Sequence, residues 1–220
     1  MTGEKCVERV GALEALPGVE ARFLTRIPEM PCALERGEAL ERLAPMHRAI
    51  LRSTLGGDYP LVTADQVHGT TIAEVTEPTM SIPIPRTDGL MTRLRGVTLG
   101  IHVADCAPVW IVARDGSAGA LLHSGRKGTE LGIVPRGIAA LTTLTGRPPG
   151  DLLLVVGPCI RPPCYETDFA TAIQAQARDA GVRDIHDEGV CTACHPERYY
   201  SYRRELGKTG RMLATLTLIP

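Results

Sequence analysis

The stretch VTLGIHVADCAPVWIVARDGSAGALLH, residues 97–123, contains three short apolar runs in succession. The runs cover 97–103, 109–113 and 118–123, and residues such as Asp, Gly and Pro separate them. Short apolar runs between turn-forming residues are typical of buried strands, because a helix of a globular domain usually needs a longer segment. We therefore expect three consecutive strands here.

Similar apolar runs flank this stretch at 61–63, 71–75 and 152–156, and we expect further strands there. Apolar residues recur at helical spacing in 34–54, in a segment that follows Gly128 and ends near Leu144, and in 168–180. Pro45 lies inside the first of these segments and is expected to kink or split that helix. This mixture of strands and helices predicts an α+β or mixed α/β fold.

The chain has 220 residues, 44% of them hydrophobic, and shows no internal repeat. A chain of this length can bury about 70% of its unfolded surface, which is enough for one core. We therefore expect a single domain spanning 1–220.

The charges of the chain nearly cancel, with 24 Lys and Arg against 25 Asp and Glu. This balance provides no general attraction to nucleic acid or to an anionic membrane, so neither is expected as a partner. No apolar run approaches the roughly 20 residues that span a bilayer. Charged residues interrupt 1–30 too often for a signal peptide. We expect a cytoplasmic protein.

Three potential metal ligands follow or end apolar runs: His68, Cys106 and His123. Two imidazoles and one thiolate suit zinc, and three protein ligands leave its fourth position for water or substrate, as in catalytic sites. Copper fits this set less well. The alternative is that each histidine is a hydrogen-bonded structural residue and that Cys106 is a buried apolar thiol.

The loop after His123 reads Ser124-Gly125-Arg126-Lys127-Gly128-Thr129. We expect a helix to begin at Thr129. Two cations and the amides of two glycines before a helix are typical of an anion site. The loop therefore predicts phosphate binding by Gly125, Arg126, Lys127 and Gly128.

Four further cysteines, Cys159, Cys164, Cys191 and Cys194, allow a competing Cys₄ zinc site. The four-residue gap between the first two is wide for such ligands, and plain packing is the alternative. The CTACH spacing at 191–195 also fits covalent haem attachment, which is improbable here because no export signal is evident.

The segment 199–211 concentrates tyrosines and arginines, among them Tyr202, Arg203 and Arg211. Tyrosine with arginine can stack on a purine and bind phosphate or ribose hydroxyls, so these three residues are candidate substrate ligands. An amphipathic edge strand with a solvated charged face is the alternative.

Six ordered blocks of sequence carry a family resemblance: QVHG at 66–69, TDGLMT at 87–92, ADCAP at 104–108, HSG at 123–125, GPCI at 157–160 with CYE at 164–166, and SYRR at 201–204 with GR at 210–211. They resemble the YfiH family, the purine nucleoside phosphorylase group formerly described as laccase-domain or polyphenol oxidoreductase proteins. The resemblance covers 61–218 as a catalytic region and leaves 1–58 as a divergent N-terminal part.

The resemblance implies a single domain of mixed β-sheet with packed helices and zinc held by His68, Cys106 and His123. It also implies phosphorolysis of adenosine, inosine or methylthioadenosine, with adenosine deamination beside it. Asp88 and Asp105 are the carboxylates nearest to the motif blocks. Either is a candidate acid or base for the purine proton, and orienting a ligand or capping a turn is the alternative role.

The chain departs from the usual family motif His-Ala-Gly-Trp-Arg-Gly at 123–128. Arg126 stands where the family has tryptophan, and Lys127 stands where it has arginine. A lysine cannot form the bidentate fork of an arginine.

Two other classes of function compete with phosphorolysis. A cysteine hydrolase or deamidase would use Cys106 as nucleophile and His123 as its base. A metal-binding module without activity is the non-enzymatic alternative. A four-copper laccase is excluded within one chain, because it needs on the order of ten histidines, many in His-x-His pairs. This chain has six histidines and no such pair.

Overall fold

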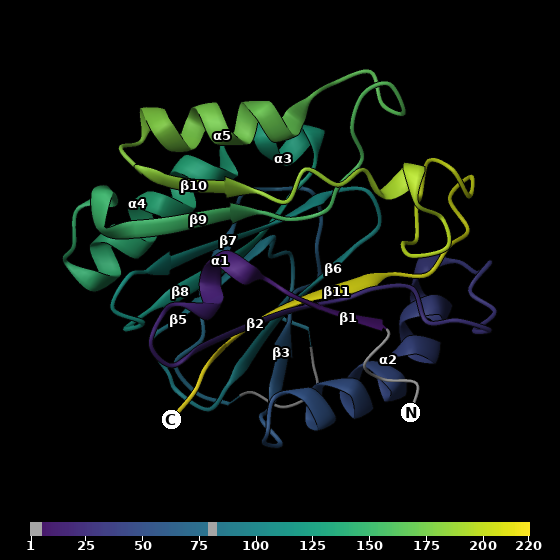
Figure 1. The fold of residues 1–220 in the computed structure, drawn as a ribbon, viewed down its shortest axis with the longest axis horizontal. Helices are drawn as coiled ribbons and strands as arrows, with labels where there is room; N and C mark the ends of the chain where they lie inside the picture. The colour runs from purple at the N-terminus through teal and green to yellow at the C-terminus, as the bar shows by residue number, and fades with distance from the viewer. Residues whose placement is uncertain (1–5, 79–82) are drawn as a thin grey trace.

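The computed structural model describes residues 6–78 and 83–220, which form two β-sheets with helices outside them (Figure 1). The five-stranded sheet has the order β1 (Val7–Arg9), β2 (Val19–Leu24), β11 (Met212–Leu218), β6 (Thr98–Val103) and β3 (Leu61–Thr63). The six-stranded sheet has the order β10 (Asp184–Asp187), β9 (Leu152–Val156), β7 (Ala107–Ala113), β8 (Gly119–Ser124), β5 (Gly89–Thr92) and β4 (Ile72–Glu74). Both sheets are mixed, since β3–β6, β4–β5 and β9–β10 pair in parallel and the other pairs are antiparallel.

Helix α2 (Arg36–Thr54) lies beside the five-stranded sheet, while α3 (Arg126–Glu130), α4 (Ile133–Thr145) and α5 (Phe169–Asp179) lie beside the six-stranded one (Figure 1). The remaining helical pieces are short: α1 (Gly11–Glu14) and the 3₁₀ turns η2 (Pro149–Asp151) and η3 (Thr192–Cys194). Within 6–78 and 83–220, no helix combines the length and apolarity needed to cross a membrane.

Strand β7 is buried on both faces, because one face meets the other sheet and the opposite face meets helices. Trp110 and Val112 belong to the core shared with the five-stranded sheet, while Val109 and Ile111 belong to the core under α4 and α5. This alternation follows from the two-residue period of a strand. The Trp110 indole N–H donates to the carbonyl of Thr215 at 2.9 Å and links the two sheets.

The same alternation directs a key side chain of β8. Leu121 packs in the core between the sheets, and Leu122 packs in the core under α4 and α5. His123 has the parity of Leu121, so the strand period turns its imidazole toward the space between the sheets. The carboxyl end of β8 thus places a buried histidine at one end of the sandwich.

The structure confirms the predicted fold class, with each expected strand and helix near its predicted position. Helix α2 runs through Pro45 without interruption, so Pro45 does not split the helix, and the alternative of a kink stays a prediction. Pro45 is exposed, and water can therefore satisfy the carbonyl that loses its helical partner.

One other local prediction is wrong, and one alternative is not found. Helix α3 begins at Arg126 rather than at Thr129, because Gly125 is the extended residue that precedes its first turn. Thr129 instead closes that turn by donating its N–H and its hydroxyl to the Gly125 carbonyl. The edge strand considered for 199–211 is absent, since these residues form turns and loop before the inner strand β11.

Candidate active site

The three predicted metal ligands meet at one end of the sheet sandwich. His68 comes from the loop between β3 and β4, Cys106 directly precedes β7, and His123 lies in β8. One ligand atom from each lies within 4.8 Å of the other two, and the two imidazole centroids are 4.8 Å apart. The site combines donors from segments 38 and 17 residues apart in sequence. We call this group the His₂Cys triad.

Asp88, just before β5, organises two members of the triad. Its Oδ1 lies 2.9 Å from Nδ1 of His123 and accepts the His68 amide at 2.9 Å. Its Oδ2 accepts the amides of Val67 and Gly69 at 3.1 and 2.7 Å. These bonds hold the loop around His68, whose φ of 60° is left-handed and uncommon for a residue with a Cβ.

The electrostatics of the triad favour charged donors. Burial raises the pKa of Cys106, but the neighbouring His123 and His68 outweigh burial and lower that pKa to about 6. Burial lowers the pKa of His123, yet Cys106 and Asp88 together raise it. Burial likewise opposes ionisation of Asp88, while hydrogen bonds from His123 and the backbone lower its pKa to about 2. These effects favour a Cys106 thiolate that lies beside two imidazoles and the ionised, hydrogen-bonded carboxylate of Asp88.

The absence of a side chain at Gly125 leaves room for the sulfur atom of Cys106. A Cβ at this position would lie 2.3 Å from Sγ of Cys106, far inside van der Waals contact. The requirement for glycine here is steric, because its φ of −91° suits any residue. Gly125 therefore belongs to the triad's immediate surroundings as well as to the predicted phosphate loop.

The donor set fits a metal ion. Catalytic zinc typically has three N or S ligands and a carboxylate that orients one of the histidines. The triad and the Asp88 carboxylate bonded to His123 match this pattern. Cys106 and His68 both line a cleft of about 790 Å³, which leaves an open side for a further ligand. The group is thus a candidate metal site at the floor of a cleft.

Asp105, the residue directly before Cys106, also lines this cleft. Its Oδ1 accepts the Thr192 hydroxyl at 2.7 Å, and its Oδ2 accepts the Ser201 hydroxyl and the Arg203 amide at 3.1 and 2.7 Å. Its φ of 84° is left-handed, and these three bonds hold the turn that presents Cys106. Both predicted acid–base candidates, Asp88 and Asp105, therefore have carboxylates occupied by donors.

The cleft walls are strongly cationic. Two acidic residues, Glu35 and Asp105, face six basic ones: Arg36, Arg126, Lys127, Arg203, Lys208 and Arg211. Four of the six already pair with carboxylates: Arg36 with Asp65, Arg126 and Arg203 with Glu166, and Lys208 with Glu35. Among the described residues Lys127 and Arg211 have no such ion pair, and their charge favours an anionic ligand. The predicted phosphate-loop cations and the predicted substrate residues Tyr202, Arg203 and Arg211 all border the same cleft as the triad.

Arg126 is half-exposed and its guanidinium lies within 3.8 Å of Glu130 and 3.5 Å of Glu166. Glu166 also pairs with Arg203 at 3.0 Å. Gly128 is buried, and a Cβ there would lie 3.4 Å from the His123 carbonyl. The loop thus brings its two cations to the cleft, with one of them already near carboxylates.

Arg211 differs from these because it is buried, with 8% of its surface exposed. Its guanidinium donates to the carbonyls of Thr209 and Gly210 and lies over the Tyr202 ring at 6.0 Å. Burial lowers its pKa. Across 6–78 and 83–220, no ion pair to Arg211 is found, so its charge faces the cleft without a carboxylate partner.

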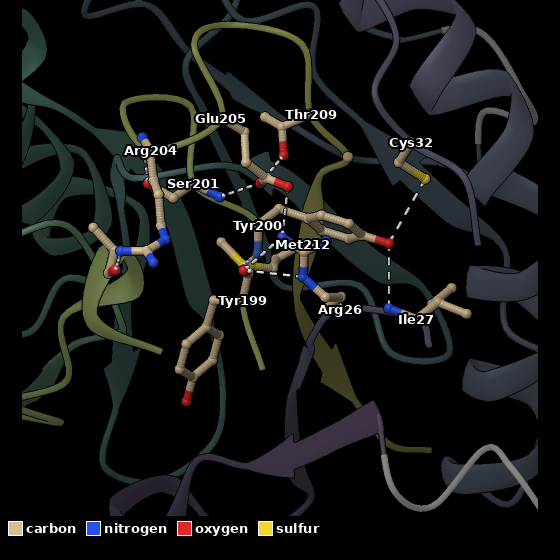
Figure 2. A network of polar contacts seen from close by, with 12 residues as sticks. Arg26, Ile27, Cys32, Tyr199, Tyr200, Ser201, Arg204, Glu205, Thr209 and Met212 are labelled. Carbon is tan, nitrogen blue, oxygen red and sulfur yellow. Dashed lines mark hydrogen bonds and ion pairs between the residues drawn. The ribbon is translucent and has the colours of Figure 1, made fainter. Parts of the chain in front are cut away.

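Figure 2 shows a polar network around Ser201 and Glu205. Tyr202 and Arg203 lie between these two residues in the sequence. Glu205 accepts the Ser201 amide at 3.0 Å, the Arg26 guanidinium at 2.8 Å and the Thr209 hydroxyl. Arg26 also lies 4.3 Å over the Tyr200 ring. The loop is therefore tied to the residues that follow β2.

Sequence reasoning gave no role to several residues that line the cleft: Arg36, Gln66, His102, Tyr165, Phe169 and Lys208. Gln66 was visible inside the QVHG block, and its side chain bridges the His68 loop to β6 through the His102 backbone at 2.7 and 3.1 Å. Tyr165 was likewise visible inside the block that contains Cys164-Tyr165-Glu166, whereas Arg36, His102, Phe169 and Lys208 come from segments that meet only in three dimensions and carry no local pattern.

The proposed Cys₄ grouping is only partly formed. Sulfur atoms of Cys164, Cys191 and Cys194 lie within 4.8 Å of one another, while Cys159 is outside this group and fully buried in the core under α5. The Cys₄ site is therefore wrong in its membership, because Cys159 serves packing.

Comparisons with known proteins agree with the fold and the motifs. The family model described as "Multi-copper polyphenol oxidoreductase laccase" matches residues 28–169 and 166–219. Purine nucleoside phosphorylase SCO2081 of Streptomyces coelicolor is 28% identical over 93% of this chain and 90% of its own length. Purine nucleoside phosphorylase YlmD of Geobacillus stearothermophilus is 30% identical over 71% of this chain and 72% of its own.

Solved structures give the same answer for the fold. The crystal structure of YlmD from Geobacillus stearothermophilus superposes with a TM-score of 0.84 at 26% identity and covers 93% of each chain. That of the Bacillus licheniformis hypothetical protein YfiH has a TM-score of 0.82 at 24% identity, over 91% of this chain and 92% of its own. With the family match over most of the sequence, these likenesses show that the chain belongs to the YfiH family of laccase-domain proteins.

Proposed function

We propose that the chain is a zinc-dependent purine nucleoside phosphorylase acting on adenosine, inosine or methylthioadenosine. The observation that carries this proposal is the His₂Cys triad at the floor of a cleft bordered by six cations, which suits a metal ion beside an anionic co-substrate. The names of the relatives SCO2081 and YlmD support the substrate class. The cytoplasmic location expected from the sequence stays a prediction.

In this proposal, phosphate binds among the cations of the cleft. Arg126 and Lys127, which line the cleft, reach it from the loop. Gly125 and Gly128 are not among the residues that line the cleft, so a role for their amides stays a prediction. Arg211 is a further phosphate ligand, because a buried guanidinium without a carboxylate partner gains most from an anion. Tyr202 and Arg203 flank the nucleoside.

The reaction exchanges one bond at the ribose. A phosphate oxygen forms a bond to C1′ while the bond from C1′ to the purine nitrogen breaks. The electron pair of that bond leaves with the purine, which then takes up a proton. A bound zinc ion supplies Lewis-acid polarisation of substrate, or an ionised water for the related deamination of adenosine.

The residues of the chain divide the remaining tasks. Asp88 orients His123 and the His68 loop, and Asp105 positions the turn before Cys106 and the start of the Tyr202–Arg203 segment. An acid–base role for either carboxylate stays a prediction, and their occupied oxygens favour positioning.

One observation favours the cysteine hydrolase as a second candidate. The thiol of Cys106 has a pKa lowered to about 6 by the adjacent His123 and His68 against the effect of burial, as a nucleophile would require. Two imidazoles rather than one contact this sulfur, which suits a shared metal better than a general base. Alkylation of Cys106 in the zinc-loaded protein separates the two roles, because a bound metal protects the thiolate.

The proposal is tested by incubating zinc-loaded protein with adenosine, inosine or methylthioadenosine, with and without phosphate, and following the products by chromatography. Phosphate-dependent release of free base that is lost in Cys106→Ala and His123→Ala is expected. Arg136→Gln, at an exposed position on α4, is the matched control and retains activity. Phosphate-independent formation of inosine from adenosine alone would reduce the protein to a deaminase, and no turnover would favour the binding module.

A further inference from the structure

A second group of sulfur atoms lies apart from the His₂Cys triad. Cys164, Cys191 and Cys194 place their Sγ atoms within 4.8 Å of one another, and those of Cys164 and Cys194 are 3.4 Å apart. We call this group the thiol cluster. Cys164 and Cys191 are partly buried and pack against the core under α5, while Cys194 is exposed, so packing alone does not explain why all three sulfur atoms meet.

The chain builds the thiol cluster from two short turns. Cys191 immediately precedes η3 and Cys194 is its last residue, and the Cys194 amide donates to the Cys191 carbonyl at 3.2 Å. A C-x₂-C turn of this kind is a common half-site for structural zinc. Cys164 arrives from the turn at 161–165, which is closed by the Tyr165 amide bonding to the Arg161 carbonyl at 3.1 Å. The third donor therefore comes from a separate segment about 30 residues away.

We propose that the thiol cluster binds one zinc ion, as a second metal site separate from the His₂Cys triad. Zinc–sulfur bonds of about 2.3 Å in a tetrahedron set the sulfur atoms about 3.8 Å apart. The observed separations, from 3.4 Å to at most 4.8 Å, need only small side-chain rotations to reach this value. The fourth position is open to solvent beside the exposed Cys194 and takes a water molecule.

Three thiols also favour a metal over a disulfide. A disulfide joins two sulfur atoms at about 2.05 Å and would leave the third cysteine without a role. A metal ion uses all three donors at separations close to those observed.

Zinc in the thiol cluster would fix one wall of the cleft. Cys164 immediately precedes Tyr165, which lines the cleft with the Arg203 guanidinium 4.7 Å over its ring. On the other side, Thr192 of η3 donates to Asp105, the residue before Cys106. The ion would therefore cross-link the Tyr165 segment to the turn that supports the His₂Cys triad, whichever reaction the cleft performs.

The test uses the full-length chain carrying Cys106→Ala, which disables the first site without touching the thiol cluster. The reduced, metal-free protein is titrated with Co²⁺ under anaerobic conditions, and sulfur-to-cobalt charge-transfer absorption is recorded. Bound zinc per chain is measured in parallel after reconstitution and dialysis. Adding Cys194→Ser or Cys164→Ser removes one donor at the surface, and adding Cys159→Ala removes a neighbouring thiol outside the cluster.

We expect Cys106→Ala protein to bind about one zinc ion per chain and to show strong thiolate-to-cobalt absorption. Cys194→Ser and Cys164→Ser should each abolish that absorption and the retention of zinc. Cys159→Ala, checked for cooperative unfolding, should retain both. The proposal is overturned if Cys106→Ala protein shows no thiolate-to-cobalt absorption, or if the absorption survives loss of Cys194. Loss with Cys159→Ala in folded protein would also overturn the three-thiol site.

Discussion

The Nδ1 atom of His123 lies 2.9 Å from Oδ1 of Asp88, and this carboxylate also receives the amide of His68. One buried side chain therefore orients two members of the His₂Cys triad. The contact fixes the imidazole of His123 through Nδ1, so Nε2 is the nitrogen left for a metal.

Asp88→Asn is expected to weaken zinc binding by about 10- to 100-fold, because an amide holds neither the imidazole nor the backbone donors as well as a carboxylate. Zinc affinity is measured by competition with a chromophoric chelator. Asp65→Asn, an exposed carboxylate two residues before the Val67 amide, is the control and should leave the affinity unchanged. Equal affinities in the two variants would refute the role of Asp88.

Asp88 also makes stability depend on pH. Its folded pKa of about 2 lies below the ordinary value of 3.8, despite the opposing effect of burial. A depressed carboxyl pKa stabilises the fold above the unfolded pKa, and this stabilisation is lost as pH falls from about 4 through 2. The contribution is on the order of 2 kcal/mol.

Metal-free protein should therefore lose stability in this interval, as measured by urea unfolding at several pH values. The loss between pH 4 and pH 2 should be smaller in Asp88→Asn. Identical pH profiles for the two proteins would contradict the assignment.

Much of the site was predictable because each triad member sits in a short motif at the end of an apolar run. Gly69 follows His68, Pro108 lies two residues after Cys106, and His123 ends an apolar run. Each of the three ligands is therefore marked by its neighbours in the sequence. Strand β11 was not predicted, because Thr215 and Thr217 make its sequence look half polar. Both are in fact buried, with Thr217 bonded to Thr98 at 2.9 Å and Thr215 to the Arg22 carbonyl at 3.3 Å.

The cationic lining of the cleft was only partly predictable for a related reason. Arg36 opens α2, and Lys208 lies in the loop before β11. They meet Arg126 at the cleft only because the two sheets pack together. Such long-range convergence has no local sequence signature. The same limit explains why the sequence did not separate Cys159 from the thiol cluster.

Gly125→Ala is expected to weaken zinc binding, since the new Cβ would lie 2.3 Å from Sγ of Cys106. Relief of such a contact typically costs about 1–3 kcal/mol, so we expect affinity for zinc to fall by roughly 10- to 100-fold. Gly37→Ala, where nothing lies within 4 Å of an added Cβ, is the matched control. Chelator competition on both variants measures the effect, and unchanged zinc affinity in Gly125→Ala would be inconsistent with the geometry.

The Cys106 thiolate should persist to low pH in metal-free protein. Its pKa of about 6, set by His123 and His68 against burial, lies well below the ordinary thiol value of 9.0. Alkylation of Cys106 by iodoacetamide, followed by peptide mass spectrometry, should therefore lose its rate with a midpoint near pH 6. His123→Ala should move the midpoint upward. A midpoint near 9 in the unaltered protein would show that the imidazoles do not act on this thiol.

Arg211→Gln should raise the KM for phosphate by roughly 10- to 100-fold, because charged hydrogen bonds contribute about 1.5–3 kcal/mol. Lys127→Gln tests the loop independently, and Arg136→Gln again serves as the control away from the cleft. Steady-state kinetics with varied phosphate at fixed nucleoside measure the change. A phosphate KM that moves only in Lys127→Gln would assign the anion to the loop alone.

The most direct test of phosphorolysis is to identify the sugar product. Zinc-loaded protein is incubated with inosine and phosphate, and the mixture is followed by phosphorus NMR while chromatography quantifies hypoxanthine. The account predicts a new sugar phosphate, ribose 1-phosphate, in a one-to-one ratio with the released base, and neither product with Cys106→Ala. Release of base with free ribose and no sugar phosphate would contradict phosphorolysis and show hydrolysis instead.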